Sequence, residues 1–107
     1  MKYQGHSITL ERWADMSLAE QMANVGAEVG RAINWRKKGN EELSLHAFYR
    51  ALDLLGLSKQ VYKGSRLQEI CRLYEVLVDY FAGENVYGSS DELMNKYFYP
   101  FNLLARR

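Results

Sequence analysis

A short turn between two apolar stripes, within residues 32–55, constrains the fold of this chain more than any other feature. Ala32 and Trp35 lie three residues apart, a spacing that places both side chains on one face of a helix. Gly39 follows a run of three basic residues, which is typical of a helix C-terminus. Asn40 can then cap a second helix. The segment therefore predicts two antiparallel helices joined by a very short connection.

Along most of the chain, apolar residues recur at three- and four-residue steps, which indicates amphipathic helices. Capping boxes formed by Ser17 with Glu20 and by Ser65 with Gln68 predict two helix starts. We expect Pro100 to kink or end the last helix, because proline lacks the backbone N–H. The predicted fold is all-α, a small helical bundle of three main helices plus a short C-terminal fourth helix. These helices are expected near 17–38, 41–56, 66–82 and 90–99, with Gly56 as the stop of the second and a cap at 89–92 for the fourth. Phe48 and Leu77, on their apolar stripes, are expected to be buried.

A length of 107 residues predicts a single domain, residues 1–107. Residues 1–14 are expected to form an N-terminal arm that Trp13 anchors on the bundle, and residues 57–64 a loop. The tail at 97–107 is too apolar to be left in water, so it should dock on its own bundle or on a second copy.

Charge and cysteine content exclude several classes of protein. The formal net charge of +1 gives no overall field that would recruit nucleic acid, so a basic patch would have to be local. The one cysteine, Cys71, excludes a disulfide framework within the chain. The N-terminal segment has no apolar signal-peptide region, and no run is long enough to span a membrane. We expect a cytoplasmic protein with no membrane partner.

The sequence carries few groups that suggest chemistry. Glu42 and His46 lie one helical turn apart, but two ligands do not make a metal site. Cys71 lies on an apolar stripe, where burial makes a thiol less reactive. Glu75 and Asp79 are one turn apart and are expected to face solvent as an ordinary charged pair. No glycine-rich phosphate loop is present. We predict no catalytic residue, no metal and no cofactor.

Basic and aromatic residues cluster at the turn between the first two helices. A basic patch with aromatic side chains can hold a phosphate backbone and stack on bases. The same cations can instead complement the negative end of the first helix dipole, and we favour this interpretation. The residues that would contact nucleic acid or another partner are Arg31, Trp35, Arg36, Lys37 and Lys38.

A second stripe of small residues on the first helix suggests close packing against another helix. The tail adds more apolar side chains than one helix face can bury. A homodimer is therefore expected, in which the tail or the small face of the first helix contacts a second copy. The alternative is a tail folded across its own bundle. The candidate interface residues are Ala23, Gly26, Gly30, Tyr97, Phe98, Phe101 and Leu104.

Parts of the chain resemble known helical families. Ala32, Trp35 and Gly39, continuing through Ser44, Phe48, Ala51 and Leu52, resemble a single tetratricopeptide-type hairpin, a family that binds peptides and partner proteins. The match covers about 25–30 residues, and no second repeat follows. The same segment is similar to the core hairpin of HEPN-type bundles. Neither His6 nor His46 has an arginine four to six residues before it, so that resemblance implies a non-nuclease member.

Other segments are similar to a group of short prokaryotic all-helical proteins that carries no known activity. They are residues 34–40, 77–80 and 97–101. This resemblance implies a prokaryotic cytoplasmic setting. Together with the interface candidates, the sequence predicts a non-enzymatic protein-interaction or assembly module. The alternative is an RNA-binding or HEPN-related helical bundle that lacks the nuclease motif.

Overall fold

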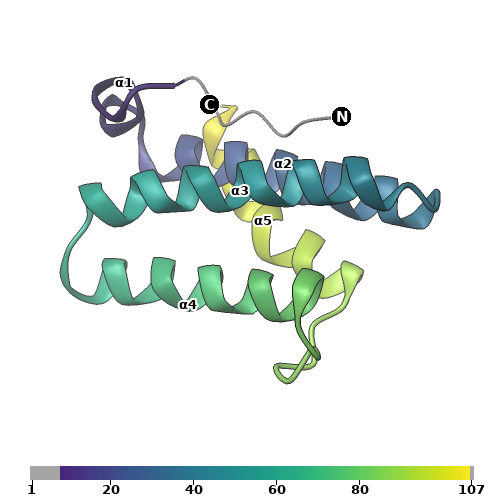
Figure 1. Cartoon of the computed structure of the whole chain (residues 1–107). Coiled ribbons are helices and arrows are strands. Elements are labelled where there is room, and N and C mark those ends of the chain that lie inside the picture. The colour runs from purple at the N-terminus through teal and green to yellow at the C-terminus, as the bar shows by residue number, and fades with distance from the viewer. Residues whose placement is uncertain (1–7, 107) are drawn as a thin grey trace.

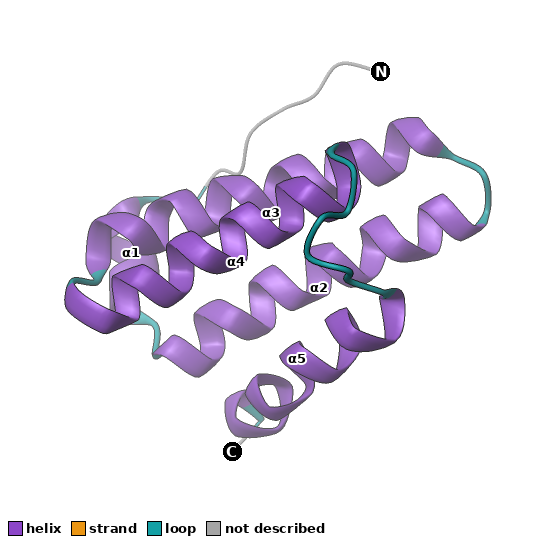
Figure 2. Ribbon diagram, turned by 90° about the horizontal axis from the view of Figure 1, so that it is seen from below, coloured by secondary structure: helices purple, strands orange, loops and turns teal. Residues whose placement is uncertain are grey.

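The chain forms an all-α fold, as a computed structural model that describes residues 8–106 shows. The predicted class is confirmed, and no strand occurs within the described residues. Helices α2 and α3 form an antiparallel hairpin, α4 lies along α3, and α5 crosses α2 (Figures 1 and 2). The helices are α1 (Leu10–Asp15), α2 (Leu18–Lys37), α3 (Glu41–Val61), α4 (Gly64–Ala82) and α5 (Asp91–Ala105).

The turn between α2 and α3 forms as the sequence predicts. Gly39 has a φ of +79°, a left-handed conformation that favours glycine. The Gly39 N–H donates to the Arg36 carbonyl at 3.0 Å, and the Asn40 N–H donates to the Trp35 carbonyl at 2.9 Å. These two bonds make a Schellman motif. The Asn40 side chain then accepts from the Leu43 N–H at 3.1 Å and caps α3.

Of the predicted helix starts, those of α2 and α5 are confirmed, whereas that of α4 is wrong. Ser17 and Glu20 form a complete capping box, and Ser90 accepts from the first turn of α5. In contrast, α4 begins at Gly64, whose φ is +66°, and no side chain caps it. The predicted cap Ser65 therefore lies inside the first turn.

The predicted loop at 57–64 is also wrong, because α3 continues through Gly56 to Val61. The reason is tertiary. Ser58 is fully buried and accepts from the Trp13 indole N–H at 2.8 Å. Its hydroxyl donates to Gln21 Oε1 at 2.7 Å. This network fixes the last turn of α3 against α1 and α2 and outweighs the glycine stop signal.

Trp13 anchors the N-terminal segment on the bundle as predicted, but through a short helix, α1, rather than an extended arm. Gln21 Nε2 donates to the Trp13 carbonyl at 2.9 Å, which ties α1 to α2. The rest of the arm predicted for residues 1–14 includes residues 1–7, which lie outside the described residues.

The last helix differs most from its prediction. It was expected to end near residue 99, yet α5 passes through Pro100 to Ala105, so residues 8–106 contain four long helices instead of three. Proline removes one backbone hydrogen bond from the helix, and its ring crowds the carbonyl four residues earlier. Met94 and Phe98 are buried and hold α5 on α2, which offsets that loss.

The core lies mainly between α2, α3 and α4. Phe48 and Leu77 are buried as predicted. The small-residue face of α2 accepts α5 at Gly26, where a methyl group would lie only 2.8 Å from Phe98 Cγ. At Gly30, a methyl group would meet no atom within 4 Å. Close packing therefore requires only the first of these two glycines.

Candidate functional site

An open groove separates α4 from α5. Helix α4 packs on α3 and α5 packs on α2, so the two outer helices face each other without close backbone contact along their length. The groove between them has a volume of about 740 Å³. This lies within the ~300–1,000 Å³ range of ligand-binding clefts.

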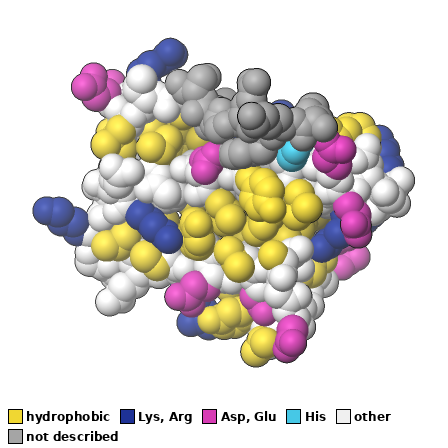
Figure 3. Space-filling view, viewed as in Figure 1, with side chains coloured by type: hydrophobic (Ala, Val, Ile, Leu, Met, Phe, Trp, Pro, Cys, Tyr) yellow, Lys and Arg dark blue, Asp and Glu magenta, His cyan; other side chains and the backbone are white. Residues whose placement is uncertain are grey.

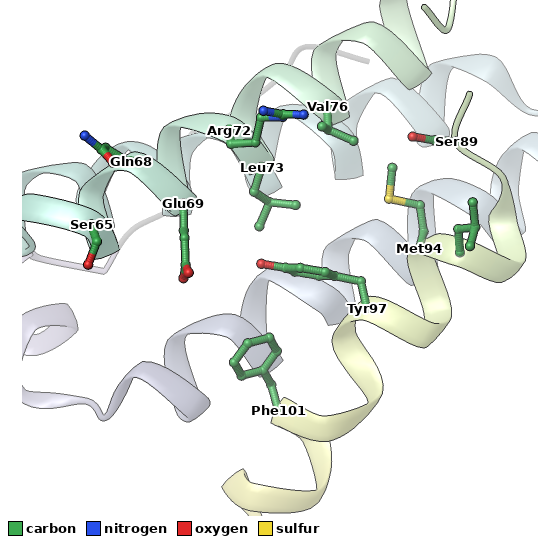
Figure 4. A pocket seen from close by; sticks show the side chains of 11 residues that line it. Ser65, Gln68, Glu69, Arg72, Leu73, Val76, Ser89, Met94, Tyr97 and Phe101 are labelled. Atoms are coloured by element: carbon green, nitrogen blue, oxygen red, sulfur yellow. The ribbon is translucent and has the colours of Figure 1, made fainter. Parts of the chain in front are cut away.

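The groove has an apolar floor and a few polar side chains on its walls. Leu73 and Val76 of α4 face Met94, Tyr97 and Phe101 of α5 (Figure 4). The α4 wall also carries polar and charged side chains, and Ser89 and Leu93 complete the lining. The polar residues of the α4 wall are Ser65, Gln68, Glu69 and Arg72.

Glu69 and Tyr97 approach each other across the groove. Figure 4 shows both polar ends directed into the space between the helices. Burial, and then the nearby Glu69 carboxylate, raise the pKa of the Tyr97 phenol, which therefore stays a neutral donor at physiological pH. The Arg72 guanidinium lies 5.0 Å from the centroid of the Tyr87 ring.

Apolar surface continues from the groove along α5. Leu93, Tyr97 and Leu104 are 55%, 43% and 51% exposed, which is unusual for side chains of this size. Ten large hydrophobic residues are exposed in the described part of the chain, and seven of them lie between residues 86 and 104. Leu93, Tyr97 and Leu104 share one face of α5, and an exposed apolar stripe of this kind is typical of interaction sites.

A second apolar area covers the middle of the face where α3 and α4 lie side by side (Figure 3). Partly buried apolar side chains of α3 and α4 pack against the core. Phe48 lies 5.2 Å from Phe81 and 5.5 Å from Tyr49 between ring centroids. We therefore interpret this area as the outer edge of the core, and the groove is the stronger candidate site.

A charged cluster fixes the start of α5 and thus one end of the groove. The Tyr80 hydroxyl donates to Asp91 Oδ1 at 2.5 Å, and Arg36 lies 3.3 Å from the same oxygen. The Arg36 guanidinium also lies over the Tyr80 and Phe81 rings, at 4.5 and 4.7 Å. Burial first, then the Asp91 contact, raise the pKa of Tyr80. These contacts join α2, α4 and α5 at one point.

The predicted basic contact residues are mostly engaged within the chain. Arg36 belongs to the cluster just described, and Lys37 lies 3.9 Å from Asp91. Arg31 pairs at 2.9 Å with buried Glu28, which Arg50 of α3 also contacts at 3.1 Å. Lys38 lies 5.1 Å from the half-buried Trp35 ring. The turn is therefore less available for a phosphate backbone than its sequence suggests.

The predicted interface residues divide into two groups. Phe98 and Gly26 pack against each other inside one chain, and Ala23 and Gly30 are half-buried on α2. Tyr97, Phe101 and Leu104 lie on the groove side or on the exposed surface of α5. The α4 wall, above all Glu69, Leu73 and Val76, was missed. Leu73 continues the helical stripe of Ile70 and Leu77, but no sequence signal shows that a groove opens beside it.

The side chains considered for chemistry have structural partners. Asp79 accepts the Val86 and Tyr87 N–H groups at 2.7 and 3.0 Å and organises the loop before α5. Glu75 accepts from the Tyr87 hydroxyl at 3.3 Å, and Cys71 is a half-buried free thiol. Within residues 8–106, no group of three or more His, Cys, Asp or Glu side chains could hold a metal ion. Among the helices of this described region, none is both long and apolar enough to cross a bilayer.

These features define a small all-α protein with a preformed apolar groove. Comparison of the chain with protein-family models, curated proteins and solved structures finds no match in any of the three. The geometry of the groove is therefore the feature of this chain that bears on its function.

Proposed function

We propose that this protein is a non-enzymatic interaction module whose α4–α5 groove receives an apolar helix of another protein chain. The groove, continuous with exposed Leu93 and Leu104, is the observation that carries the proposal. Its α4 wall runs from Ser65 to Val76, which is about 16 Å at the helical rise. That length accommodates about three turns of an amphipathic helix with apolar anchors at i, i+4 and i+7. A prokaryotic, cytoplasmic setting is part of this proposal.

A selection from a displayed library of helical peptides tests the proposal. We expect enrichment of peptides with an apolar stripe, and binding should weaken at least tenfold when Leu93→Asp places a charge on the exposed lining of the groove. A matched control is Leu45→Asp, since Leu45 lies on the exposed face of α3 away from the groove. Both variants must first show wild-type helicity by circular dichroism. Selected peptides that bind Leu93→Asp as well as the wild type would refute the proposed site.

Nucleic-acid binding is the alternative, and the structure gives it less support. The cations of the α2–α3 turn already contact Asp91, Glu28 or aromatic rings. Retention on RNA at low salt with a steep loss at higher salt would favour this alternative. The expected result is no salt-dependent retention of the wild-type protein.

A further inference from the structure

We infer that the occupant of the groove is a second copy of this chain, with each copy placing its α5 in the α4–α5 groove of the other. This inference deepens the proposed function and rests on it. The chain carries both parts of such an interface side by side, because α5 lines one wall of the groove and also presents an exposed apolar ridge. A surface that is self-complementary in this way suits a two-fold dimer.

The ridge and the groove match in length. Leu93, Tyr97 and Leu104 are separated by four and seven residues, so they form one stripe on α5. From Leu93 to Leu104 this stripe spans about 16 Å. The α4 wall from Ser65 to Val76 has the same number of residues and thus the same length. An antiparallel α5–α5 pair would therefore fill both grooves at once.

The ridge supplies the apolar centre of such an interface. An aromatic side chain buries roughly 150–250 Å² when fully covered. Leu93, Tyr97 and Leu104 are each about half exposed and share one face of α5, so they offer roughly 200–350 Å² per copy. The α4 wall of the groove must supply the rest of the ~800 Å² that each partner buries in a standard interface.

Two opposite charges lie at positions that such a dimer would bring together. Glu69 stands on the α4 wall of the groove, and Lys96 lies next to Tyr97 at the edge of the α5 ridge. Neither forms an ion pair within the described chain, whereas Arg31, Arg36, Lys37 and Arg50 all do. In the dimer, Glu69 of each copy would face Lys96 of the other, which gives two equivalent contacts.

The test is reciprocal charge reversal, read out as mass by light scattering coupled to size exclusion. The wild type should show twice the 12.4 kDa monomer mass at high micromolar concentration. Glu69→Lys and Lys96→Glu should each raise the dimer dissociation constant roughly tenfold, because both contacts become repulsive. An equimolar mixture of the two variants should restore the dimer, since every contact in the heterodimer again pairs opposite charges. Asp15→Lys, a charge reversal on exposed α1, is the control that should leave the dimer unchanged.

Three results would overturn the inference. They are a wild type that stays at 12.4 kDa, a dimer that both reversals leave intact, and a variant mixture that stays monomeric. A monomer that still binds selected helical peptides in the groove would refute only the second copy as occupant. A monomer that binds none would refute the proposed function as well.

Discussion

The contact between Gly26 of α2 and Phe98 of α5 gives the sharpest test of the fold. A methyl group at position 26 would lie 2.8 Å from Phe98 Cγ and 2.9 Å from its Cβ and Cδ1. Carbon atoms pack favourably at about 3.5–4.0 Å. Because Phe98 is buried, its ring has little room to move aside. The substitution Gly26→Ala should therefore push α5 away from α2.

The expected magnitude follows from two opposing terms. Overpacking in a core costs about 1–3 kcal/mol. Replacing a mid-helix glycine by alanine returns about 1 kcal/mol through helix propensity. Gly26→Ala should thus lower the free energy of unfolding by about 0–2 kcal/mol. Gly30→Ala gains the propensity term without the clash, since nothing lies within 4 Å of the added methyl group. Gly30→Ala should therefore raise the free energy of unfolding by about 1 kcal/mol.

Urea denaturation of both variants measures the difference between their free energies of unfolding. This difference should be about 1–3 kcal/mol, which is the cost of the clash alone. The effect of Gly26→Ala should also shrink in a Phe98→Ala background, where only one of the three close atoms remains. If Gly26→Ala stabilised the protein as much as Gly30→Ala does, α5 would not pack on α2 as described. The groove depends on that packing, so it would be refuted as well.

Three further predictions address other contacts. Ser58→Ala removes the buried partner of an indole N–H and an amide oxygen, and should cost about 1–3 kcal/mol in urea denaturation. Hydrogen bonds from Ser17, first from its backbone N–H and then from its hydroxyl, lower the pKa of Glu20. The stability that these bonds contribute is present above pH 4.5 and is lost as the pH falls through the folded-state pKa of Glu20. Ser17→Ala removes only the hydroxyl and keeps the backbone N–H donor, so it should raise the Glu20 pKa only part of the way toward 4.5 in an NMR titration. The raised pKa of Tyr80 means that its contact with Asp91 stabilises below pH 10.0 and is lost as the pH rises through the folded-state value. Asp91→Asn should lower that pKa in an ultraviolet titration of the phenol.

The features predicted correctly from sequence are those encoded by neighbouring residues. The Schellman turn at Gly39 needs only a glycine after a helix and a capping Asn40. The Ser17–Glu20 box is likewise contained within four residues. Helical spacing alone was enough to predict that Phe48 would be buried. Each of these signals is contained in a few neighbouring residues.

The errors occur where a distant contact overrides a local signal. Gly56 and Pro100 were each predicted to end a helix, but both lie inside helices. At Gly56, the bonds of Ser58 to α1 and α2 extend α3 beyond the stop. At Pro100, burial of Phe98 against Gly26 holds the helix in place. Such partners lie many residues away in the sequence, so neighbouring residues alone do not predict them.

The longer α5 explains why the candidate site could be predicted only in part. The apolar surplus of the tail is visible in the sequence, but its direction depends on which helix α5 packs against. Since Phe98 and the Arg36–Tyr80–Asp91 cluster hold α5 on α2, its Tyr97 side is turned toward α4 without touching its backbone. The groove is thus a consequence of how α5 is anchored. Variants that loosen the anchor should weaken groove binding even where they leave every lining residue unchanged.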